Sequence, residues 1–174
     1  QSLSEMTCVN GLIRLMTPED GEDQLERFVL NKEDPSRFEN EMAAHNVDDK
    51  RKAIMHKVLD RFQGCAATQE SFMTLSQELV GFSLKEADAL RKTVAKKKMS
   101  EIEKQKELFF TRGKENQLSD EVVEYFWKVV VEPSLGYGFS ENHAVPYSMV
   151  GVQCILLGGI LFPKIYWQTA CLLQ

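Results

Sequence analysis

The chain reads Ser83-Leu84-Lys85-Glu86-Ala87-Asp88-Ala89-Leu90-Arg91-Lys92-Thr93-Val94-Ala95-Lys96-Lys97-Lys98 near its middle, and this stretch decides the fold class. It opens with a capping-box pattern, in which a serine and a glutamate three residues later satisfy free N–H groups at a helix start. Ala87, Leu90 and Val94 recur at helical spacing, so one side of the helix is apolar. The pattern predicts an amphipathic helix from Ser83 to about Lys98.

The same apolar spacing recurs on both sides of this stretch. It predicts helices over 22–31, 36–45, 48–62, 68–80 and 100–115, and another that begins at Ser119. Gly81 is placed to cap the 68–80 helix at its C-terminal end. Only Cys8 to Leu15 leaves room for a short strand, and the chain has no internal repeat. We therefore expect an all-α or nearly all-α fold, a compact assembly of about eight helices.

Length and composition are those of an ordinary globular domain. The 174 residues are 43% apolar and 27% charged, which is enough to form a sizeable core without disulfides or structural metals. The cysteines form no C-x-x-C pair, so zinc-knuckle spacing is absent; we expect reduced, mostly buried thiols unless the compartment is oxidising. The cysteines are Cys8, Cys65, Cys154 and Cys171. With 21 basic and 26 acidic residues the net charge is -5, so nucleic-acid binding would require a local basic patch.

The C-terminal part of the chain is strongly apolar. Val145 to Phe162 is an 18-residue stretch without charge, at the lower edge of membrane-spanning length. Because it contains a proline and Gln153, we expect a buried core helix rather than a membrane span. Phe162-Pro163 should end this helix, and Lys164 to Leu173 should form a second core helix. Gln153 should find a partner or the surface, and Lys164 should reach solvent.

Three sequence blocks carry a resemblance to a known family. They are Thr68-Gln69-Glu70-Ser71-Phe72-Met73 with Leu79 to Asp88, then Leu90 to Lys98, then Gly136-Tyr137-Gly138-Phe139-Ser140-Glu141-Asn142-His143-Ala144-Val145-Pro146-Tyr147-Ser148. Their order and spacing resemble the fingers of the bacterial DNA polymerase III alpha subunit and the other family-C polymerases. The resemblance is strong from about Thr68 to the end and thin over residues 1–66. We therefore treat 1–174 as one fingers fragment, with the nucleotide-binding helices and C-terminal core helices in 67–174.

Some positions depart from the family pattern. Thr68 replaces a tyrosine, and Arg91-Lys92 replaces a double arginine, although lysine lacks the planar fork of arginine. Glu141 stands where the family has a lysine, and Pro146 replaces an alanine. The chain begins at Gln1 without an initiator methionine and ends in an apolar run. These features indicate a piece of a longer chain from a divergent branch, viral or plasmid-borne.

The resemblance implies a part of a DNA-directed DNA polymerase that binds an incoming deoxynucleoside triphosphate and primer-template DNA beside the palm and thumb of its parent chain. Nucleotidyl transfer uses carboxylates that hold two metal ions. In the family the palm binds this Mg²⁺, whereas Asp48-Asp49 here points two carboxylates about 100° apart on a helix. The isolated chain is therefore expected to be inactive. The expected location is cytoplasmic: nucleoid-associated in bacteria, or the host cytoplasm for a virus.

The resemblance assigns a triphosphate clamp to the helix that was quoted first. Its candidate residues are Arg91, Lys92, Lys96 and Lys97. They form a broad cationic side, which we expect to be open and largely unpaired; Asp88, i,i+4 to Lys92, is the main competitor. Without the resemblance, the same pattern reads as a solvated basic face near a helix C-terminus.

A second group of candidates lies in and around the glycine-flanked loop predicted over Pro133 to Pro146. These residues are Tyr137, Phe139, His143 and Tyr147. Aromatic rings can stack on a base, and His143 and Tyr147 can donate hydrogen bonds; alternatively, the aromatics anchor the loop to the core. We expect the loop beside one end of the 83–98 helix. Gln69 and Glu70 would support the cationic helix, or form only a polar helix start.

Two other classes of protein remain open from the sequence. A non-enzymatic helical interaction module would use an exposed C-terminal apolar face to bind a partner. A membrane-anchored protein would require Val145 to Phe162 to face lipid all round. We expect no membrane contact, and the openness of the Arg91 to Lys98 side separates the polymerase reading from the interaction module.

Overall fold

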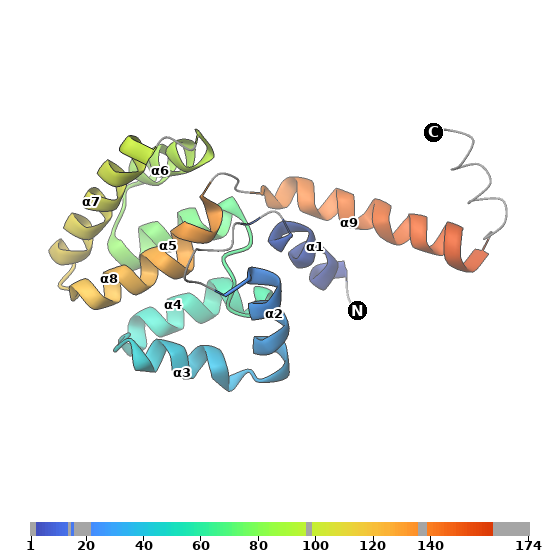
Figure 1. Ribbon diagram of the computed structural model, residues 1–174, viewed down its shortest axis with the longest axis horizontal. Helices are drawn as coiled ribbons and strands as arrows, with labels where there is room; N and C mark the ends of the chain where they lie inside the picture. Colours follow the sequence, from blue (N-terminus) through green and yellow to red (C-terminus); the bar gives the residue numbers. More distant parts are fainter. Residues whose placement is uncertain (1–2, 14, 16–21, 97–98, 136–138, 162–174) are drawn as a thin grey trace.

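Nine α-helices and no strand make up the part of the chain that the computed structural model describes, residues 3–13, 15, 22–96, 99–135 and 139–161 (Figure 1). The helices are α1 (Leu3–Leu12), α2 (Gln24–Glu33), α3 (Ser36–Ala44), α4 (Asp49–Leu59), α5 (Gln69–Val80), α6 (Leu84–Lys96), α7 (Met99–Glu115), α8 (Asp120–Phe126) and α9 (Glu141–Ile155). A 3-10 turn (Asp60–Phe62) follows α4. A π-helical turn (Trp127–Val131) and a 3-10 turn (Glu132–Ser134) extend α8, and a second π-helical turn (Leu156–Leu161) extends α9. The all-α prediction is confirmed.

Local side-chain chemistry sets many of the helix ends. The side chains that accept hydrogen bonds from the first-turn N–H groups belong to Asp23, Asp48, Thr68 and Ser119. Ser83 and Glu86 form the predicted capping box: the Ser83 N–H donates to the Glu86 carboxylate at 2.8 Å, and the Glu86 N–H donates to the Ser83 hydroxyl oxygen at 3.3 Å. Gly81 ends α5 with φ 82°, a left-handed conformation that glycine adopts at low cost. The boundaries of α5 and α6 are thus encoded in a few neighbouring residues.

Helices α3 to α8 share one large apolar core. Helix α5 lies at its centre and packs against α4, α6, α7 and the π-helical turn that follows α8. Phe109 contacts Phe82 and Trp127 edge to face, with ring centroids 5.5 Å and 5.4 Å apart. Helix α6 buries its predicted apolar side, Ala87, Leu90 and Val94, in this core. That burial fixes which side of α6 remains toward solvent.

A smaller apolar cluster joins α1 and α2 to the chain around residues 62–67. Its members are Cys8, Leu12, Phe28, Phe62, Cys65 and Ala67. The described cysteines are free thiols, as predicted: Cys8 and Cys65 are buried and Cys154 is half-buried, while Cys171 lies outside the described residues. Burial raises the pKa of the Cys65 thiol to about 12, so this thiol packs as a small apolar group. The sequence left open a short strand over Cys8 to Leu15. That alternative is wrong, because Cys8 to Leu12 form the last part of α1.

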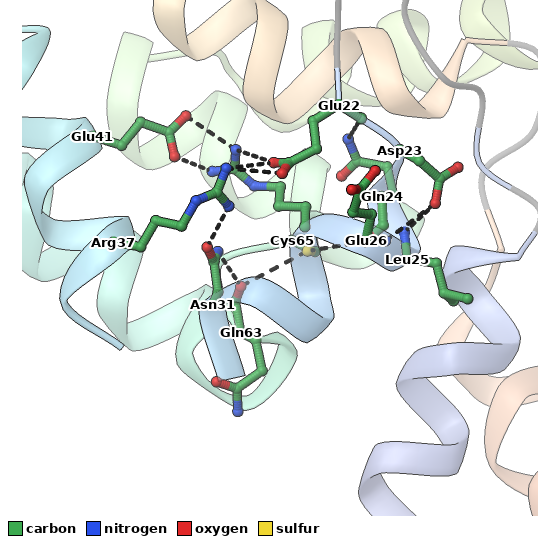
Figure 2. A network of polar contacts seen from close by, with 11 residues as sticks. Glu22, Asp23, Gln24, Leu25, Glu26, Asn31, Arg37, Glu41, Gln63 and Cys65 are labelled. Atoms are coloured by element: carbon green, nitrogen blue, oxygen red, sulfur yellow. Dashed lines mark hydrogen bonds and ion pairs between the residues drawn. The ribbon is translucent and has the colours of Figure 1, made fainter. Parts of the chain in front are cut away.

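A polar network ties α2 to α3 and to the turn after Phe62 (Figure 2). Arg27 is almost fully buried and donates to both carboxylate oxygens of Glu41, at 3.1 Å and 2.5 Å. Arg37 donates in the same two-pronged way to Glu22, at 2.8 Å and 2.9 Å. Asn31 accepts from Arg37 and donates to the Gln63 carbonyl at 2.7 Å. Because a buried charge without a partner is costly, this network fixes the packing of the N-terminal helices.

Helix α9 departs from expectation. It packs against α1 and runs away from the other helices (Figure 1). Large apolar side chains of α9 are exposed, so the prediction of a buried core helix is wrong within the described residues. The predicted loop ends at Ser140, and Pro146 lies inside α9. Gln153 reaches the surface, as expected.

The C-terminal prediction also concerned a helix break and a membrane span. The expected break at Phe162-Pro163, the helix from Lys164 to Leu173 and the exposure of Lys164 all fall outside the described residues. Within the part that is described, no helix has both the length and the apolar character needed to cross a membrane.

Candidate functional site

The exposed side of α6 carries the predicted cations. Lys92 and Lys96 are exposed on the solvent side of the helix, and Arg91 is half-buried at the edge of the side that carries Ala87 and Val94. We call Arg91, Lys92 and Lys96 the cationic face. Lys97 was also predicted to belong to it, but it lies outside the described residues.

Two of these cations share one carboxylate. Arg91 donates from Nε and Nη2 to Oδ1 of Asp88 at 3.0 Å and 2.8 Å, and Nζ of Lys92 lies 2.6 Å from Oδ2. The expectation that the cations are unpaired is therefore wrong for Arg91 and Lys92. The reason is local: side chains three and four residues apart on a helix are neighbours. Hydrogen bonds from Lys92 and Arg91 lower the pKa of Asp88, and Lys96 has no ion-pair partner among the described residues.

Glu86 does not compete for this face, because α7 holds it. Arg112 donates to Glu86 Oε1 from Nε at 3.2 Å and from Nη2 at 2.7 Å. The Arg112 bonds, together with those from Ser83, lower the pKa of Glu86 to about 2. This ion pair links the first turn of α6 to the last turns of α7.

The end of the loop that precedes α9 is attached to the start of α5. The Gln69 N–H donates to the Phe139 carbonyl at 3.0 Å. Glu70 accepts from the Ser140 hydroxyl at 2.7 Å and from the Glu141 N–H at 3.0 Å. Ser140 precedes α9 but its own side chain does not cap the helix, so Glu70 supplies the cap from another helix. These hydrogen bonds of Gln69 and Glu70 go to the start of α9, not to α6.

Electrostatics favour this arrangement at the start of α9. Burial raises the pKa of Glu70, but the hydrogen bonds from Glu141 N–H and Ser140 outweigh it, so the net pKa is lowered. A carboxylate at a helix N-terminus is also stabilised by the helix dipole. Arg61 adds a two-pronged ion pair to Glu141, at 2.7 Å and 2.8 Å. Helices α5 and α9 and the turn after α4 therefore meet at Ser140 and Glu141.

The aromatic and histidine candidates divide into three groups. Phe139 is 5% exposed, which favours the alternative that it anchors the loop rather than stacks on a ligand. His143 and Tyr147 lie one turn apart on α9, both exposed. Tyr137 and its flanking glycines lie outside the described residues. The expectation that this loop lies beside one end of α6 remains a prediction.

Acidic and other metal-ligating side chains are dispersed over the described residues. No three of the His, Cys, Asp and Glu side chains in that part of the chain lie close enough together to hold a metal ion. Sequence reasoning found the cationic face and named Asp88 as its main competitor, but it missed the Glu70 cap. Asp88 is visible in the sequence from its spacing, whereas Glu70 and Ser140 are 70 residues apart and nothing in the sequence links them.

Fold and site define an all-helical domain that presents clustered cations on one helix. The sequence matches the family described as "Bacterial DNA polymerase III alpha subunit finger domain" over residues 1–117, about two thirds of the chain. The chain belongs to this family.

Curated relatives agree with this assignment. The chain is 35% identical over 175 aligned residues to "Probable DNA polymerase YorL" of Bacillus subtilis and to "DNA-directed DNA polymerase" of Bacillus phage SPbeta, with 99% of the chain covered in each case. It is 28% identical over 157 residues, 88% of the chain, to "DNA polymerase III subunit alpha" of Treponema pallidum. The chain spans 13% of the length of each of these relatives.

Proposed function

We propose that this domain is the nucleotide- and template-engaging fingers of a replicative family-C DNA polymerase, and that the cationic face of α6 holds the triphosphate of the incoming deoxynucleotide. Family membership supports the first part. The observation that carries the second is that Lys92 and Lys96 project from the solvent side of α6, and that Arg91 lies half-buried at the edge of its buried side. The core thus holds the helix still while the cations remain accessible, and preorganised charges of this kind are effective in stabilising transferred phosphoryl groups.

The Asp88 pairs are compatible with this role. Both partners are partly exposed to water, where ion pairs contribute little. A triphosphate carries several negative charges and accepts more hydrogen bonds than one carboxylate, so it can displace Asp88 at small cost. Before the triphosphate binds, Asp88 keeps the Arg91 and Lys92 head groups near one another, which reduces the side-chain entropy lost on binding. Lys96, for which the described residues provide no ion-pair partner, can contact a phosphate without breaking such a pair.

The proposal divides the other candidate residues by role. Tyr137, His143 and Tyr147 would contact the nucleotide or the primer-template, while Phe139 anchors the segment before α9 and Glu70 positions the start of α9. The Mg²⁺ ions of nucleotidyl transfer would be held by the palm of the parent chain. The parent polymerase would work in the cytoplasm, on the nucleoid or on viral DNA.

Steady-state kinetics of the complete polymerase test the proposal. Arg91→Ala should lower kcat/KM for the nucleotide by the equivalent of about 2 to 4 kcal/mol, as for other preorganised electrostatic groups, with kcat reduced as well. Lys57→Ala is the matched control, because it removes an exposed cation from α4 and should leave kcat/KM unchanged. Unchanged kcat/KM in Arg91→Ala would show that the α6 cations are only a solvated face. The 174-residue chain alone should incorporate no nucleotide.

A further inference from the structure

Exposed apolar side chains are concentrated on α9. Among the described residues, twelve large apolar side chains are exposed, and seven of them lie on α9 and the π-helical turn that follows it. The seven are Val145, Tyr147, Met149, Val150, Ile155, Leu156 and Leu157. Single exposed apolar residues are normal on a protein surface, but a contiguous group marks an interaction site.

One side of α9 already has a partner. Ala144 and Ser148 are buried against α1, and Asn10 donates to the Ser148 hydroxyl at 2.8 Å. Val145, Met149 and Leu156 are spaced so that they form a stripe on a different side, and Val150 and Leu157 form a second stripe beside it. We call these five residues the open face. Ile155 follows Ser148 by two helical turns yet is 59% exposed, so α9 extends beyond the reach of α1.

Charge argues against DNA as the occupant of this face. From Asn142 to Leu161 the chain has no lysine or arginine, whereas phosphate backbones are bound mainly by these residues. A membrane surface is disfavoured by the same lack of lysine and arginine, because helices that lie on membranes are rich in these residues on their polar face. The remaining occupants are protein surfaces: another part of the same polypeptide, or a second copy.

We propose that the open face of α9 is covered by another domain of the same polymerase chain, so that α9 is an internal docking helix of the complete enzyme. The inference rests on the proposed function, because it takes this domain to be part of a longer polymerase. Its support is the length of the relatives: the chain spans 13% of them, which leaves most of the polypeptide available beside this domain. An apolar surface that another domain of the same chain covers is not exposed to water in the complete protein.

Cys154 is a natural probe of this surface. It is half-buried on α9, whereas Cys8 and Cys65 are buried. In the 174-residue chain, a maleimide should label Cys154 readily, as read by peptide mass mapping. In the complete polymerase, labelling of Cys154 should be at least tenfold slower. The measurement uses neither nucleotide nor DNA, so its result is independent of whether α6 binds a triphosphate.

Two variants of the complete polymerase sharpen the test. Met149→Glu should uncouple the interface and restore fast labelling of Cys154, while Val29→Glu on α2, at an equally exposed apolar position (47% against 48%), should not. Met149 is preferred to Val150, because Val150 is i−4 to Cys154 and a carboxylate there would itself disfavour the thiolate.

Three results would overturn the proposal. Equal labelling rates in the two proteins would mean that the face stays open in the complete enzyme. Slow labelling in the 174-residue chain at low concentration would mean that this chain covers α9 by itself. Labelling that slows with concentration in the 174-residue chain, without protection in the dilute complete polymerase, would identify a second copy as the occupant.

Discussion

Removal of the Glu70 side chain should weaken the attachment of the start of α9 to α5. Glu70 accepts a hydrogen bond from the Ser140 hydroxyl at 2.7 Å and another from the Glu141 N–H at 3.0 Å. It is the cap for a helix whose own N-cap side chain makes no capping hydrogen bond. Both contacts join segments 70 or more residues apart in the sequence, so no local structure can replace them.

The expected loss follows from these contacts. A hydrogen bond to a charged group contributes about 1.5 to 3 kcal/mol, and loss of an N-cap costs about 0.5 to 2 kcal/mol. Since the two contacts are parts of one cap and water can enter the site, we expect Glu70→Ala to lower the free energy of unfolding by about 2 to 3 kcal/mol. Glu70→Gln keeps an acceptor and should lose about 1 kcal/mol.

Urea unfolding followed by circular dichroism measures this loss. Glu78→Ala is the control, because it removes a more exposed carboxylate from the same helix, and it should cost under about 0.5 kcal/mol. The pKa of Glu70 is lowered in the folded chain, so its charge adds stability above the unfolded pKa and loses it as pH falls through the folded pKa. The difference between the wild-type chain and Glu70→Gln should therefore shrink below about pH 4. Equal losses in Glu70→Ala and Glu78→Ala would refute the capping role.

Two further predictions concern other parts of the fold. Burial opposes the charged form of His56, but hydrogen bonds to Glu39 at 2.9 Å and Asp60 at 2.8 Å raise its pKa. His56→Gln should therefore lower the free energy of unfolding near pH 5.5, and this loss should disappear as pH rises through the folded pKa. An NMR titration of His56 and unfolding curves at several pH values would measure both effects. Gly81→Ala should lower the free energy of unfolding by more than about 1 kcal/mol in a thermal melt, because φ is 82° and a new Cβ would lie 2.4 Å from Asn116 Nδ2; a loss as small as that at an exposed helical site would show that Gly81 is replaceable.

Helix positions could be predicted from the sequence where their ends are encoded locally. The Ser83–Glu86 capping box and Gly81 lie within a few residues of the boundaries that they set. Helix α1 gave no such signal, because Asn10 and Gly11 interrupt its pattern. Gly11 packs so closely on the chain at Ala67 that an added Cβ would lie 2.8 Å from the Ala67 carbonyl oxygen. Tertiary packing, rather than local propensity, therefore forms this helix.

The candidate site shows the same division between local and distant information. The cations of α6 follow from helical spacing, and so does their pairing with Asp88, once the i,i+3 and i,i+4 distances are considered. The Glu70 cap depends on the meeting of two helices that only the fold brings together. The uncharged run of α9 predicts contact with apolar surface, but the sequence does not say whether that surface belongs to this domain.

Affinity labelling of the complete polymerase tests the central claim most directly. A deoxynucleoside triphosphate with a photoreactive group on its terminal phosphate would be bound with primer-template, irradiated and mapped by mass spectrometry. The account predicts adducts within residues 91–98 that excess natural nucleotide suppresses, with Lys92→Ala and Lys96→Ala each reducing their yield. Adducts confined to other parts of the chain, with none in residues 91–98, would contradict the assignment of the triphosphate to α6.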